Sequence, residues 1–294
     1  MEDKNKKCII SGTSGFVGSR IKEHFIKNNW DVFELKHIAK NINTQDKKII
    51  PYTLGKELES NIFNGIDALI HCAYDFKVRT WKDIYKTNVQ GSIALLKAAK
   101  DNGIKKIIFI SSIAAFEDCT SLYGKAKLEV EKEAIKLGAT IIRPGLVYGK
   151  DSGGMFGALN KVTSITNIIP VIGNGNNIMY MVHISDLCKL VFNICTDEIK
   201  ANGKPITAAF KTGKTFKNIL KTMVNAKGKK PVFIPIPYTL VLYGLKFCEA
   251  IGLKIRIRSD SLTSMLHSNT NPYFDPAIQN KFVFEEFNEK NLNS

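Results

Sequence analysis

A short apolar run that leads directly into three glycines constrains this chain more than any other feature. The run Cys8-Ile9-Ile10-Ser11 is followed by Gly12-Thr13-Ser14-Gly15-Phe16-Val17-Gly18, and Arg20 to Asn28 continues with helical periodicity. Glycines three residues apart permit a tight turn and let an anion approach bare backbone at the positive end of the next helix. The segment therefore predicts a strand, a turn and a helix that together hold the pyrophosphate of a dinucleotide.

Apolar segments beyond this turn extend the same pattern. Helices are predicted over 88–100 and 123–137, and further strands over 32–35, 49–50, 66–73, 106–110 and 140–144. Strands that are apolar throughout, rather than at alternate positions, indicate a parallel sheet covered by helices on both faces. We therefore expect an α/β protein with a Rossmann-type doubly wound parallel sheet and a smaller C-terminal substrate-binding region.

The alternation of strands and helices weakens after Gly149, where segments rich in glycine and asparagine appear. A strand is still predicted over 179–184, and helices over 186–195 and 240–251. We expect residues 1–150 to form the dinucleotide-binding domain, with 179–196 returning to it. Residues 151–294 are then mostly a substrate-binding cap over the carboxyl edge of the sheet.

Composition restricts the class of protein and its partners. The chain has 294 residues, 44% of them hydrophobic, and 42 Lys and Arg against 27 Asp and Glu give a net charge of +15. Such a charge favours anionic ligands and tolerates nonspecific contact with nucleic acid or acidic lipid. The lysines are scattered, and the densest cluster (Lys227, Lys229 and Lys230) is interpreted as a solvated loop. We therefore expect a small-molecule substrate and no specific nucleic-acid partner.

Six cysteines without a C-x-x-C pair indicate reduced thiols. The first residues are polar, and the longest hydrophobic region, Ile234 to Leu253, is interrupted by prolines and charges. These features predict a cytoplasmic protein without a transmembrane segment. The five histidines show no spacing suited to a metal, so no metal site is expected.

Tyr123 and Lys127 form the main chemical pair of the sequence. Their spacing of four places both side chains on one face of the predicted helix. An ammonium beside a phenol favours the phenolate and should lower the pKa of the phenol towards neutrality, which suits a general acid or base. This spacing is common on helix surfaces, but here Ser112 ends the preceding strand, where its hydroxyl can share a substrate oxygen with Tyr123.

With these motifs in place, the chain resembles an extended short-chain dehydrogenase/reductase, the group that contains the NAD-dependent epimerase/dehydratase family. The catalytic set is matched by Ser112, Tyr123 and Lys127. The other matching segments are Gly12 to Gly18, Asn88-Val89-Gln90-Gly91, Leu95 to Ala99, Arg143-Pro144-Gly145-Leu146-Val147-Tyr148-Gly149 and Val182-His183-Ile184-Ser185-Asp186-Leu187.

The resemblance implies a mechanism and a set of roles. Tyr123 exchanges a proton with the substrate oxygen while the nicotinamide exchanges a hydride with the same carbon. Lys127 binds the nicotinamide ribose and tunes Tyr123, and Ser112 orients the oxygen, with Ser111 as the alternative serine. Asn88 holds local backbone and a water.

The resemblance also implies the ligand contacts. Asp75, Phe76 and Arg143 are expected at the substrate, and a homodimer is expected through the helices that start near Asn88 and Tyr123. His71 and His183 are interpreted as structural residues rather than bases. The expected cofactor contacts are Gly12, Thr13, Ser14, Gly15, Phe16, Val17, Gly18, Lys36, His37, Cys72, Ala73, Tyr123, Lys127, Pro144 and Val147.

Departures from the family pattern affect the cofactor and the substrate. Lys36 and His37 stand where an acidic residue usually accepts the ribose of NAD, which favours NADP over NAD slightly; a shift in register would put Glu34 there and reverse the preference. Met179 and Tyr180 replace an arginine that commonly holds the substrate diphosphate, with Arg256 or Arg258 as alternatives.

Two functions remain open from the sequence. The first is an NAD(P)-dependent enzyme acting on a sugar, nucleotide-linked or lipid-linked. Ile113 and Ala114 stand where dehydratases carry an acidic pair, which favours epimerisation or reduction. The second is a noncatalytic NAD(P)-binding sensor, scaffold or RNA-contacting protein, against which the retained Ser112, Tyr123 and Lys127 argue.

Overall fold

The computed structural model describes residues 5–37, 46–251 and 259–292. Its strands are β1 (Lys7–Ser11), β2 (Asp31–Lys36), β3 (Ile49–Pro51), β4 (Ala68–His71), β5 (Lys106–Ile110), β6 (Thr140–Pro144), β7 (Leu146–Tyr148), β8 (Ile168–Ile172), β9 (Ile178–Met179), β10 (Met181–His183), β11 (Ile206–Ala208), β12 (Lys214–Thr215) and β13 (Val232–Ile236). Its helices are α1 (Phe16–Lys27), α2 (Trp81–Ile84), α3 (Gly91–Asp101), α4 (Leu122–Lys136), α5 (Gly154–Ile165), α6 (Ile184–Cys195), α7 (Phe216–Asn225), α8 (Tyr238–Ala250), α9 (Ser259–Leu266) and α10 (Pro276–Lys281), with a 3₁₀ turn at Ser60–Phe63 and a π-helical segment at Tyr85–Gln90.

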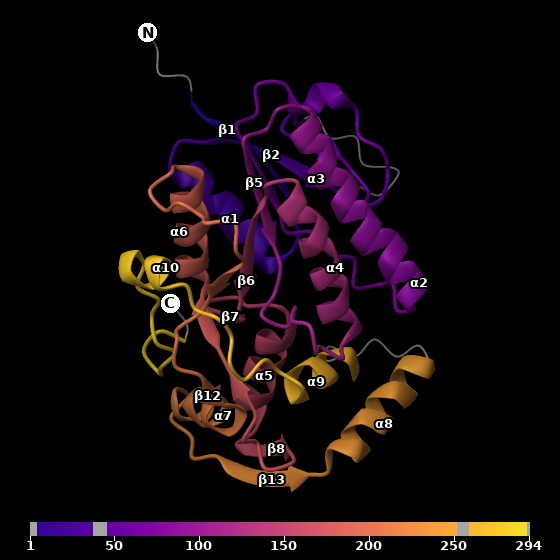
Figure 1. Cartoon of the computed structure of the whole chain (residues 1–294). Helices are drawn as coiled ribbons and strands as arrows, with labels where there is room; N and C mark the ends of the chain where they lie inside the picture. The colour runs from indigo at the N-terminus through magenta and orange to yellow at the C-terminus, as the bar shows by residue number, and fades with distance from the viewer. Residues whose placement is uncertain (1–4, 38–45, 252–258, 293–294) are drawn as a thin grey trace.

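A seven-stranded sheet forms the centre of the molecule (Figure 1). Its order is β11-β6-β5-β4-β1-β2-β3, and every neighbouring pair is parallel. The chain proceeds outward from β1 in one direction through β2 and β3, and in the other through β4, β5 and β6. This confirms the doubly wound Rossmann-type fold. Ligands of such sheets bind at the carboxyl ends of the strands where the order reverses, here between β1 and β4.

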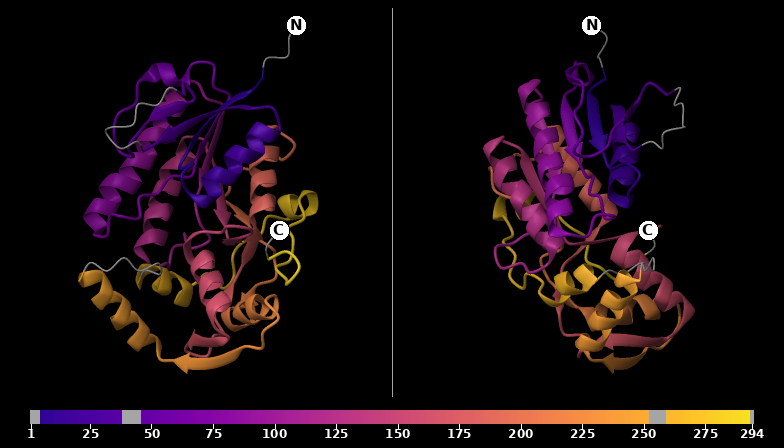
Figure 2. Two further views of the ribbon diagram at one scale, coloured as in Figure 1. Left: turned by 180° about the vertical axis from the view of Figure 1, so that it is seen from behind. Right: turned by 90° about the vertical axis from the view of Figure 1, so that its right-hand side faces the viewer.

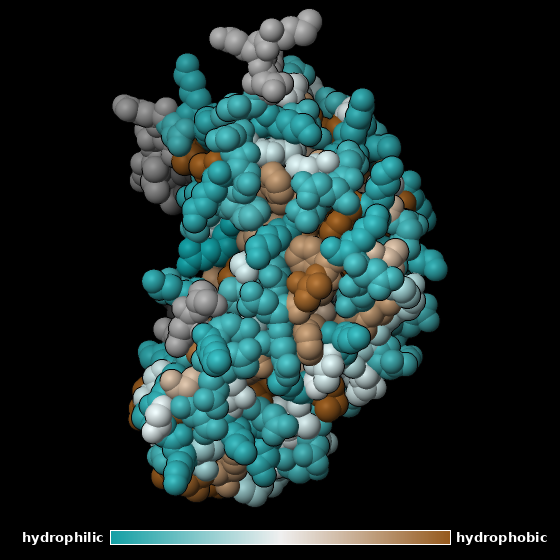
Figure 3. Space-filling model, turned by 90° about the vertical axis from the view of Figure 1, so that its left-hand side faces the viewer, coloured by the Kyte–Doolittle hydropathy of each residue, from teal (hydrophilic) through white to brown (hydrophobic). Residues whose placement is uncertain are grey.

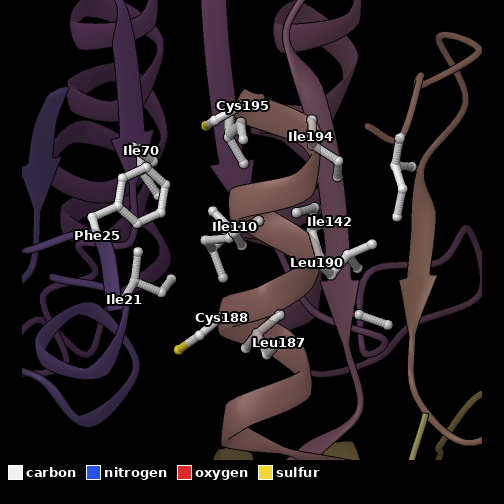
Figure 4. Close-up of a cluster of buried hydrophobic side chains, with 14 of the residues drawn as sticks. Ile21, Phe25, Ile70, Ile110, Ile142, Leu187, Cys188, Leu190, Ile194 and Cys195 are labelled. Atoms are coloured by element: carbon white, nitrogen blue, oxygen red, sulfur yellow. The ribbon is translucent and has the colours of Figure 1, made fainter. Parts of the chain in front are cut away.

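Helices cover both faces of the sheet (Figure 2). Along β1, Cys8 and Ile10 point into the core under α1 and α6, whereas Ile9 points into the core under α3 and α4. All three are fully buried, which explains why the strands are apolar throughout. Figure 4 shows the first core, where side chains of α1 and α6 meet those of β4, β5 and β6.

Segments beyond residue 150 return to this sheet. Helix α6 supplies Leu187, Leu190 and Ile194 to the core that α1 also lines, and β11 pairs with β6 at the edge. From the end of the chain, Phe282 and Phe284 pack into the same core. The return of α6 was expected, but the sequence analysis named neither β11 nor the C-terminal segment as part of the sheet region.

The lower part of the molecule in Figure 1 has a core of its own. We call residues 154–172 and 214–251, which form α5, β8, β12, α7, β13 and α8, the lower lobe. Phe156, Ile219 and Met223 are central to its core, and β8 and β13 form a two-stranded parallel sheet at its outer end. Helix α9 lies between α8 and α4 and connects the lobe to the sheet region.

The described residues include no helix with both the length and the apolar character needed to cross a membrane. They also include no group of three or more His, Cys, Asp or Glu side chains arranged to hold a metal ion. All six cysteines are unpaired. On the face shown in Figure 3 hydrophilic residues predominate, and hydrophobic residues appear only in smaller groups.

Candidate active site

The glycine turn after β1 has no room for side chains. A Cβ atom on Gly12 would lie 2.7 Å from the backbone nitrogen of Ala73, and Gly12 has a φ of 77°. A Cβ atom on Gly18 would lie 2.3 Å from the carbonyl oxygen of Gly12. Close approach of backbone to backbone therefore requires glycine at both positions, as expected for a turn that closes over a ligand's phosphates.

The start of α1 suits an anion. Within the described residues 5–37, the N-cap Gly15 provides no side-chain cap, and the first turn of α1 contains no acidic residue. The Oγ1 atom of Thr13 is buried and has no hydrogen-bond partner among the described residues. Free backbone N–H groups, a positive helix end and an unpartnered hydroxyl fit the pyrophosphate of a dinucleotide. The residues present therefore fit this cofactor.

His71 joins the ends of β1 and β4 below the turn. Its Nδ1 lies 2.6 Å from Ser11 Oγ, and its Nε2 lies 2.8 Å from Ser92 Oγ. Burial lowers the pKa of His71 to about 3, and the charge of Lys127 adds to this effect. The ring is therefore neutral and structural, as the sequence analysis expected.

The expected contacts at Cys72 and Ala73 lie beside this junction. Their backbone N–H groups both donate to Ser11 Oγ, at 3.2 Å and 3.3 Å. These bonds hold the chain after β4 against the glycine turn. Cys72 also packs with Phe16, Val17 and Val147 against the core beneath the turn.

The side chain of Ser112 faces Tyr123 closely enough to lower the pKa of the phenol. Ser112 Oγ also accepts from the backbone nitrogen of Ala114 at 3.2 Å, which fixes its position after β5. Ser111 is directed elsewhere, because its hydroxyl is buried and donates to Glu131 Oε1 at 2.5 Å. Ser112 therefore lies beside Tyr123, whereas the alternative Ser111 faces Glu131.

Lys127 lies one helical turn beyond Tyr123 and is only 4% exposed. Its Nζ donates to the carbonyl oxygen of Ile110 at 2.8 Å and lies 4.6 Å from the centre of the Phe109 ring and 5.9 Å from that of Tyr123. Burial lowers the pKa of Lys127 to about 8. The ammonium still carries its charge at neutral pH and keeps donors close to the tyrosine.

The pKa of Tyr123 corrects one expectation. Burial raises it to about 12, and the hydrogen bond from Ser112 offsets this only in part. We expected Lys127 to lower the pKa of the phenol towards neutrality, and this is wrong for the protein as described. Removal of the phenol from water outweighs the neighbouring charge, so Tyr123 holds its proton at neutral pH.

Asn88 fixes the loop that follows β4. Its Oδ1 accepts from the backbone nitrogen of Asp75 at 2.7 Å, and its Nδ2 donates to the carbonyl oxygen of Asp75 at 3.0 Å. Asn88 is buried in the π-helical segment Tyr85–Gln90, a kind of distortion that is frequent at functional sites. The expected contact of Asn88 with local backbone is thus present.

An aromatic cluster surrounds Tyr123. The ring centre of Tyr74 lies 4.9 Å from that of Tyr123 with the planes nearly perpendicular, and Phe76 stacks on Tyr123 at 5.8 Å. Phe76 is 57% exposed. Phe76 is therefore available to an incoming ligand, as expected, whereas Tyr74 was not foreseen.

Lys36 is the last residue of β2, as the predicted register required. Its neighbour His37 has Nδ1 3.1 Å from Thr53 Oγ1. Glu34, the residue that a shifted register would have placed at the strand end, is mostly buried and its Oε1 lies 3.2 Å from Lys22 Nζ. A basic residue thus stands at the end of β2.

Arg143 has a structural partner. Its Nε lies 2.9 Å from Glu131 Oε1, and its Nη2 lies 2.5 Å from Glu131 Oε2. This bidentate ion pair ties β6 to α4, and the expected contact of Arg143 with the substrate stays a prediction. Pro144 ends β6, and its carbonyl oxygen accepts from Ile113 N at 2.9 Å. Arg256 and Arg258, considered for the substrate diphosphate, lie outside the described residues.

Asp260 of α9 is a site residue that the sequence analysis missed. Its Oδ1 accepts from the backbone nitrogen of Leu122 at 2.7 Å, and its Oδ2 accepts from that of Tyr123 at 3.0 Å. The carboxylate therefore caps α4 at the residue that carries the phenol. An acid beside Ser259 indicates a helix start, but nothing local indicates a contact with Tyr123, 137 residues away.

The model of the NAD dependent epimerase/dehydratase family matches residues 8–206, which include the glycine turn, Ser112, Tyr123 and Lys127. The chain belongs to this family. It is accordingly an NAD(P)-dependent enzyme of the short-chain dehydrogenase/reductase type.

Two related proteins align with most of the chain. It is 23% identical to N-acetyl-alpha-D-glucosaminyl-diphospho-ditrans,octacis-undecaprenol 4-epimerase of Escherichia coli O157:H7, over 89% of this chain and 84% of that protein. It is 25% identical to UDP-glucose 4-epimerase of Vibrio cholerae, over 82% of each.

Solved structures share the fold. MoeE5 in complex with UDP-glucuronic acid and NAD is similar with a TM-score of 0.73 and 16% identity, over 97% of this chain and 96% of that one. UDP-N-acetylglucosamine 4-epimerase from Bacillus cereus is similar with a TM-score of 0.64 and 18% identity, over 92% and 100%. The family shares the arrangement of sheet, turn and helices found here.

Proposed function

We propose that this enzyme is an NAD(P)-dependent epimerase or ketoreductase of a sugar that is linked through a diphosphate to a nucleotide or a lipid. The observation that carries the proposal is the grouping of Ser112, Tyr123 and buried Lys127, whose Nζ lies 5.9 Å from the centre of the Tyr123 ring. The names of the Escherichia coli and Vibrio cholerae relatives support a diphospho-sugar as substrate.

In this mechanism Tyr123, Ser112 and Lys127 control one proton at the substrate oxygen. Tyr123 keeps its proton at neutral pH and donates it from Oη to the substrate oxygen, which Ser112 orients. In the opposite direction Tyr123 accepts the proton, and the ammonium of Lys127 stabilises the phenolate. The dinucleotide, when bound, supplies or accepts the hydride.

Residues around the pair position the ligands. The backbone of Gly12 to Gly18 and the hydroxyl of Thr13 would hold the pyrophosphate, and Lys127 would donate to the nicotinamide ribose. Asp75 and Phe76 stand on the loop that Asn88 fixes, where they would contact the sugar. The aromatic cluster would exclude water from the reacting atoms.

We further propose a preference for NADP over NAD. The ammonium of Lys36 and the imidazole of His37 at the end of β2 suit a 2′-phosphate, and Glu34 is already paired with Lys22. Lys36→Ala should weaken NADPH binding by roughly tenfold. NADH binding should stay unchanged, and equal loss for both cofactors would contradict the preference.

We also propose a division into domains, an oligomeric state and a cellular location. Residues 1–150 with 179–196 form the dinucleotide-binding domain and the rest of 151–294 mostly the substrate cap. The protein acts as a cytoplasmic homodimer through α3 and α4, consistent with its unpaired cysteines.

The variant Tyr123→Phe tests the proposed function. It removes one hydroxyl from a ring whose packing is unchanged, so turnover of UDP-glucose or UDP-N-acetylglucosamine should fall roughly 100- to 10,000-fold. Binding of NADH and NADPH, followed by fluorescence, should stay within about a factor of two. The matched control Tyr273→Phe removes a hydroxyl from an exposed ring and should retain full turnover. Undiminished turnover of Tyr123→Phe would refute the proton-transfer role.

A further inference from the structure

Helix α8 is hydrophobic on all sides but covered on only one. Its inner residues Val241, Leu242 and Leu245 pack against the core of the lower lobe. On the outer side Leu240 is 66% exposed, Tyr243 68% and Phe247 65%. Spacings of three and four place these residues on one face. A helix that is apolar all round is normally buried all round, so this face lacks its partner.

The apolar surface continues from α8 onto the sheet formed by β8 and β13. Alternate residues of β8, Ile169 and Val171, are buried, whereas Ile168 is 50% exposed. On β13, Val232 is 53% and Ile234 49% exposed. Only Pro237 separates β13 from α8, and the two elements run along the lower end of the molecule (Figure 1). We call Ile168, Val232, Ile234, Leu240, Tyr243 and Phe247 the apolar edge.

The surroundings of the apolar edge are strongly basic. The lower lobe, to which the apolar edge belongs, contains eight lysines and one acidic residue, Glu249. Lys221, Lys230 and Lys246 are exposed in α7, before β13 and in α8. Apolar residues combined with an excess of lysines are complementary to an anionic lipid surface.

The geometry of α8 excludes a membrane span. Thirteen residues extend about 20 Å, less than the roughly 30 Å of a bilayer's hydrocarbon core. We propose that the apolar edge docks on an anionic phospholipid membrane, with α8 lying in the plane of the interface. Leu240, Tyr243 and Phe247 then enter the boundary between headgroups and acyl chains, and the lysines contact the headgroups.

A second copy of the chain suits this surface less well. Two lower lobes brought face to face would place eight lysines against eight, with Glu249 as the single acidic residue of each lobe. The homodimer expected for the family uses α3 and α4 and leaves the apolar edge free. An anionic membrane satisfies both the apolar residues and the charge.

A chain of hydrogen bonds connects this surface to Tyr123. Glu249 at the end of α8 accepts from Ser259 N and Ser259 Oγ at 2.8 Å and 2.7 Å, and the next residue, Asp260, caps α4 at Tyr123. Arg79 Nη1 also donates to the carbonyl oxygen of Glu249 at 2.9 Å. Docking would hold the catalytic edge close to the membrane. Resting on the proposed function, this favours a lipid-linked sugar over a nucleotide-linked one.

Cosedimentation with vesicles tests the docking without sugar or cofactor. The protein should bind vesicles of phosphatidylcholine with phosphatidylglycerol, less at high salt, and bind vesicles of phosphatidylcholine alone far more weakly. Leu240→Ser with Phe247→Ser should weaken binding roughly tenfold or more. Lys230→Gln with Lys246→Gln should weaken it by a similar factor, about fivefold per charge. The control pair Ile26→Ser and Val283→Ser, 53% and 85% exposed on other elements, should bind as the parent does.

A fluorescence variant tests the proposal even where a serine variant folds poorly. Phe247→Trp should show a blue-shifted emission when anionic vesicles are added, because the indole enters the interface. No binding by the parent protein, unchanged binding by the Leu240/Phe247 variant, or unshifted emission in the vesicle-bound state would overturn the proposal. The proposal would also be overturned if the Leu240/Phe247 substitutions converted a dimer to a monomer. That result would identify a second copy of the chain as the partner of this surface. A failure of the vesicle experiments would not change the result expected for Tyr123→Phe. Undiminished turnover of Tyr123→Phe would likewise not change the result expected with vesicles.

Discussion

The sheet region and the lower lobe use hydrophobic residues in opposite ways. In the sheet region Ile9, Ile70 and Phe109 are fully buried, and glycines stand where a Cβ atom would strike backbone. In the lower lobe one face of α8 (Leu240, Tyr243 and Phe247) and two residues of β13 (Val232 and Ile234) are exposed, and Gly244 has open space around it. Internal packing and the phosphate turn explain the sequence of the first region. The second region needs something outside the chain to explain it.

The largest expected effect is the pH dependence that buried His71 imposes on the sheet region. Its pKa falls from 6.5 to about 3 on folding, so between these values the unfolded state binds a proton that the folded state does not. Stability should therefore rise with pH across this window, by about 5 kcal/mol in total.

Urea unfolding of the parent and of His71→Gln at a series of pH values measures this contribution. The difference in unfolding free energy between the two proteins should grow from pH 3 to pH 6.5 and stay constant above it. A difference that does not change with pH would show that the ring is not held neutral by the fold.

A pair of truncations compares the two hydrophobic surfaces directly. Ile70→Ala removes a fully buried side chain between α1 and the sheet and should cost about 3 kcal/mol (Figure 4). Phe247→Ala removes a larger side chain that is 65% exposed and should change the free energy of unfolding by less than about 0.5 kcal/mol. Chemical denaturation measures both. Equal losses would mean that α8 is covered within the folded chain.

A pair of glycine substitutions makes the same comparison at the backbone. Gly18→Ala in α1 forces a Cβ atom towards Gly12 O and should destabilise the protein by about 2 kcal/mol and abolish tight binding of NADPH. Gly244→Ala in α8 meets no neighbour and should stabilise the protein by about 1 kcal/mol. Thermal unfolding and cofactor titration measure both effects. If the Gly18→Ala variant kept the stability and the NADPH affinity of the parent protein, the glycine turn would not be the binding site of the cofactor.

The smallest effect concerns Asp260, the link between the two regions. Asp260→Ala removes the carboxylate that accepts from two backbone N–H groups at the start of α4 and should cost about 1 kcal/mol of stability. Turnover should fall several-fold while cofactor affinity is kept, because the cap positions Tyr123 but not the glycine turn. Asp151→Ala, an exposed acid paired with Arg20, is the control. A parallel loss of turnover and cofactor affinity would contradict the positioning role.

The sequence predicted the sheet region well because its determinants are local. The glycine turn, the apolar strands and the spacing of Tyr123 and Lys127 each express one nearby geometric requirement, and Ser112 follows from its place at a strand end. Features that depend on distant segments could not be read in this way. The pairing of β11 with β6 and the cap from Asp260 join residues far apart in the chain, and the ion pair of Arg143 with Glu131 depends on how α4 packs beside β6.

The pKa of Tyr123 was missed for a related reason. Sequence spacing reveals the neighbouring ammonium, but not the degree to which Tyr74, Phe76 and the sheet shield the phenol from water. Burial decides the sign of the shift, and burial is a property of the whole fold.

A crystal structure of the complex with a pyridine dinucleotide tests the central claim most directly. The account predicts the pyrophosphate against the backbone of Gly12 to Gly18, and the nicotinamide ring beside the hydroxyl of Tyr123, with Lys127 donating to its ribose. A dinucleotide bound elsewhere, or a Tyr123 side chain directed away from the nicotinamide, would contradict it.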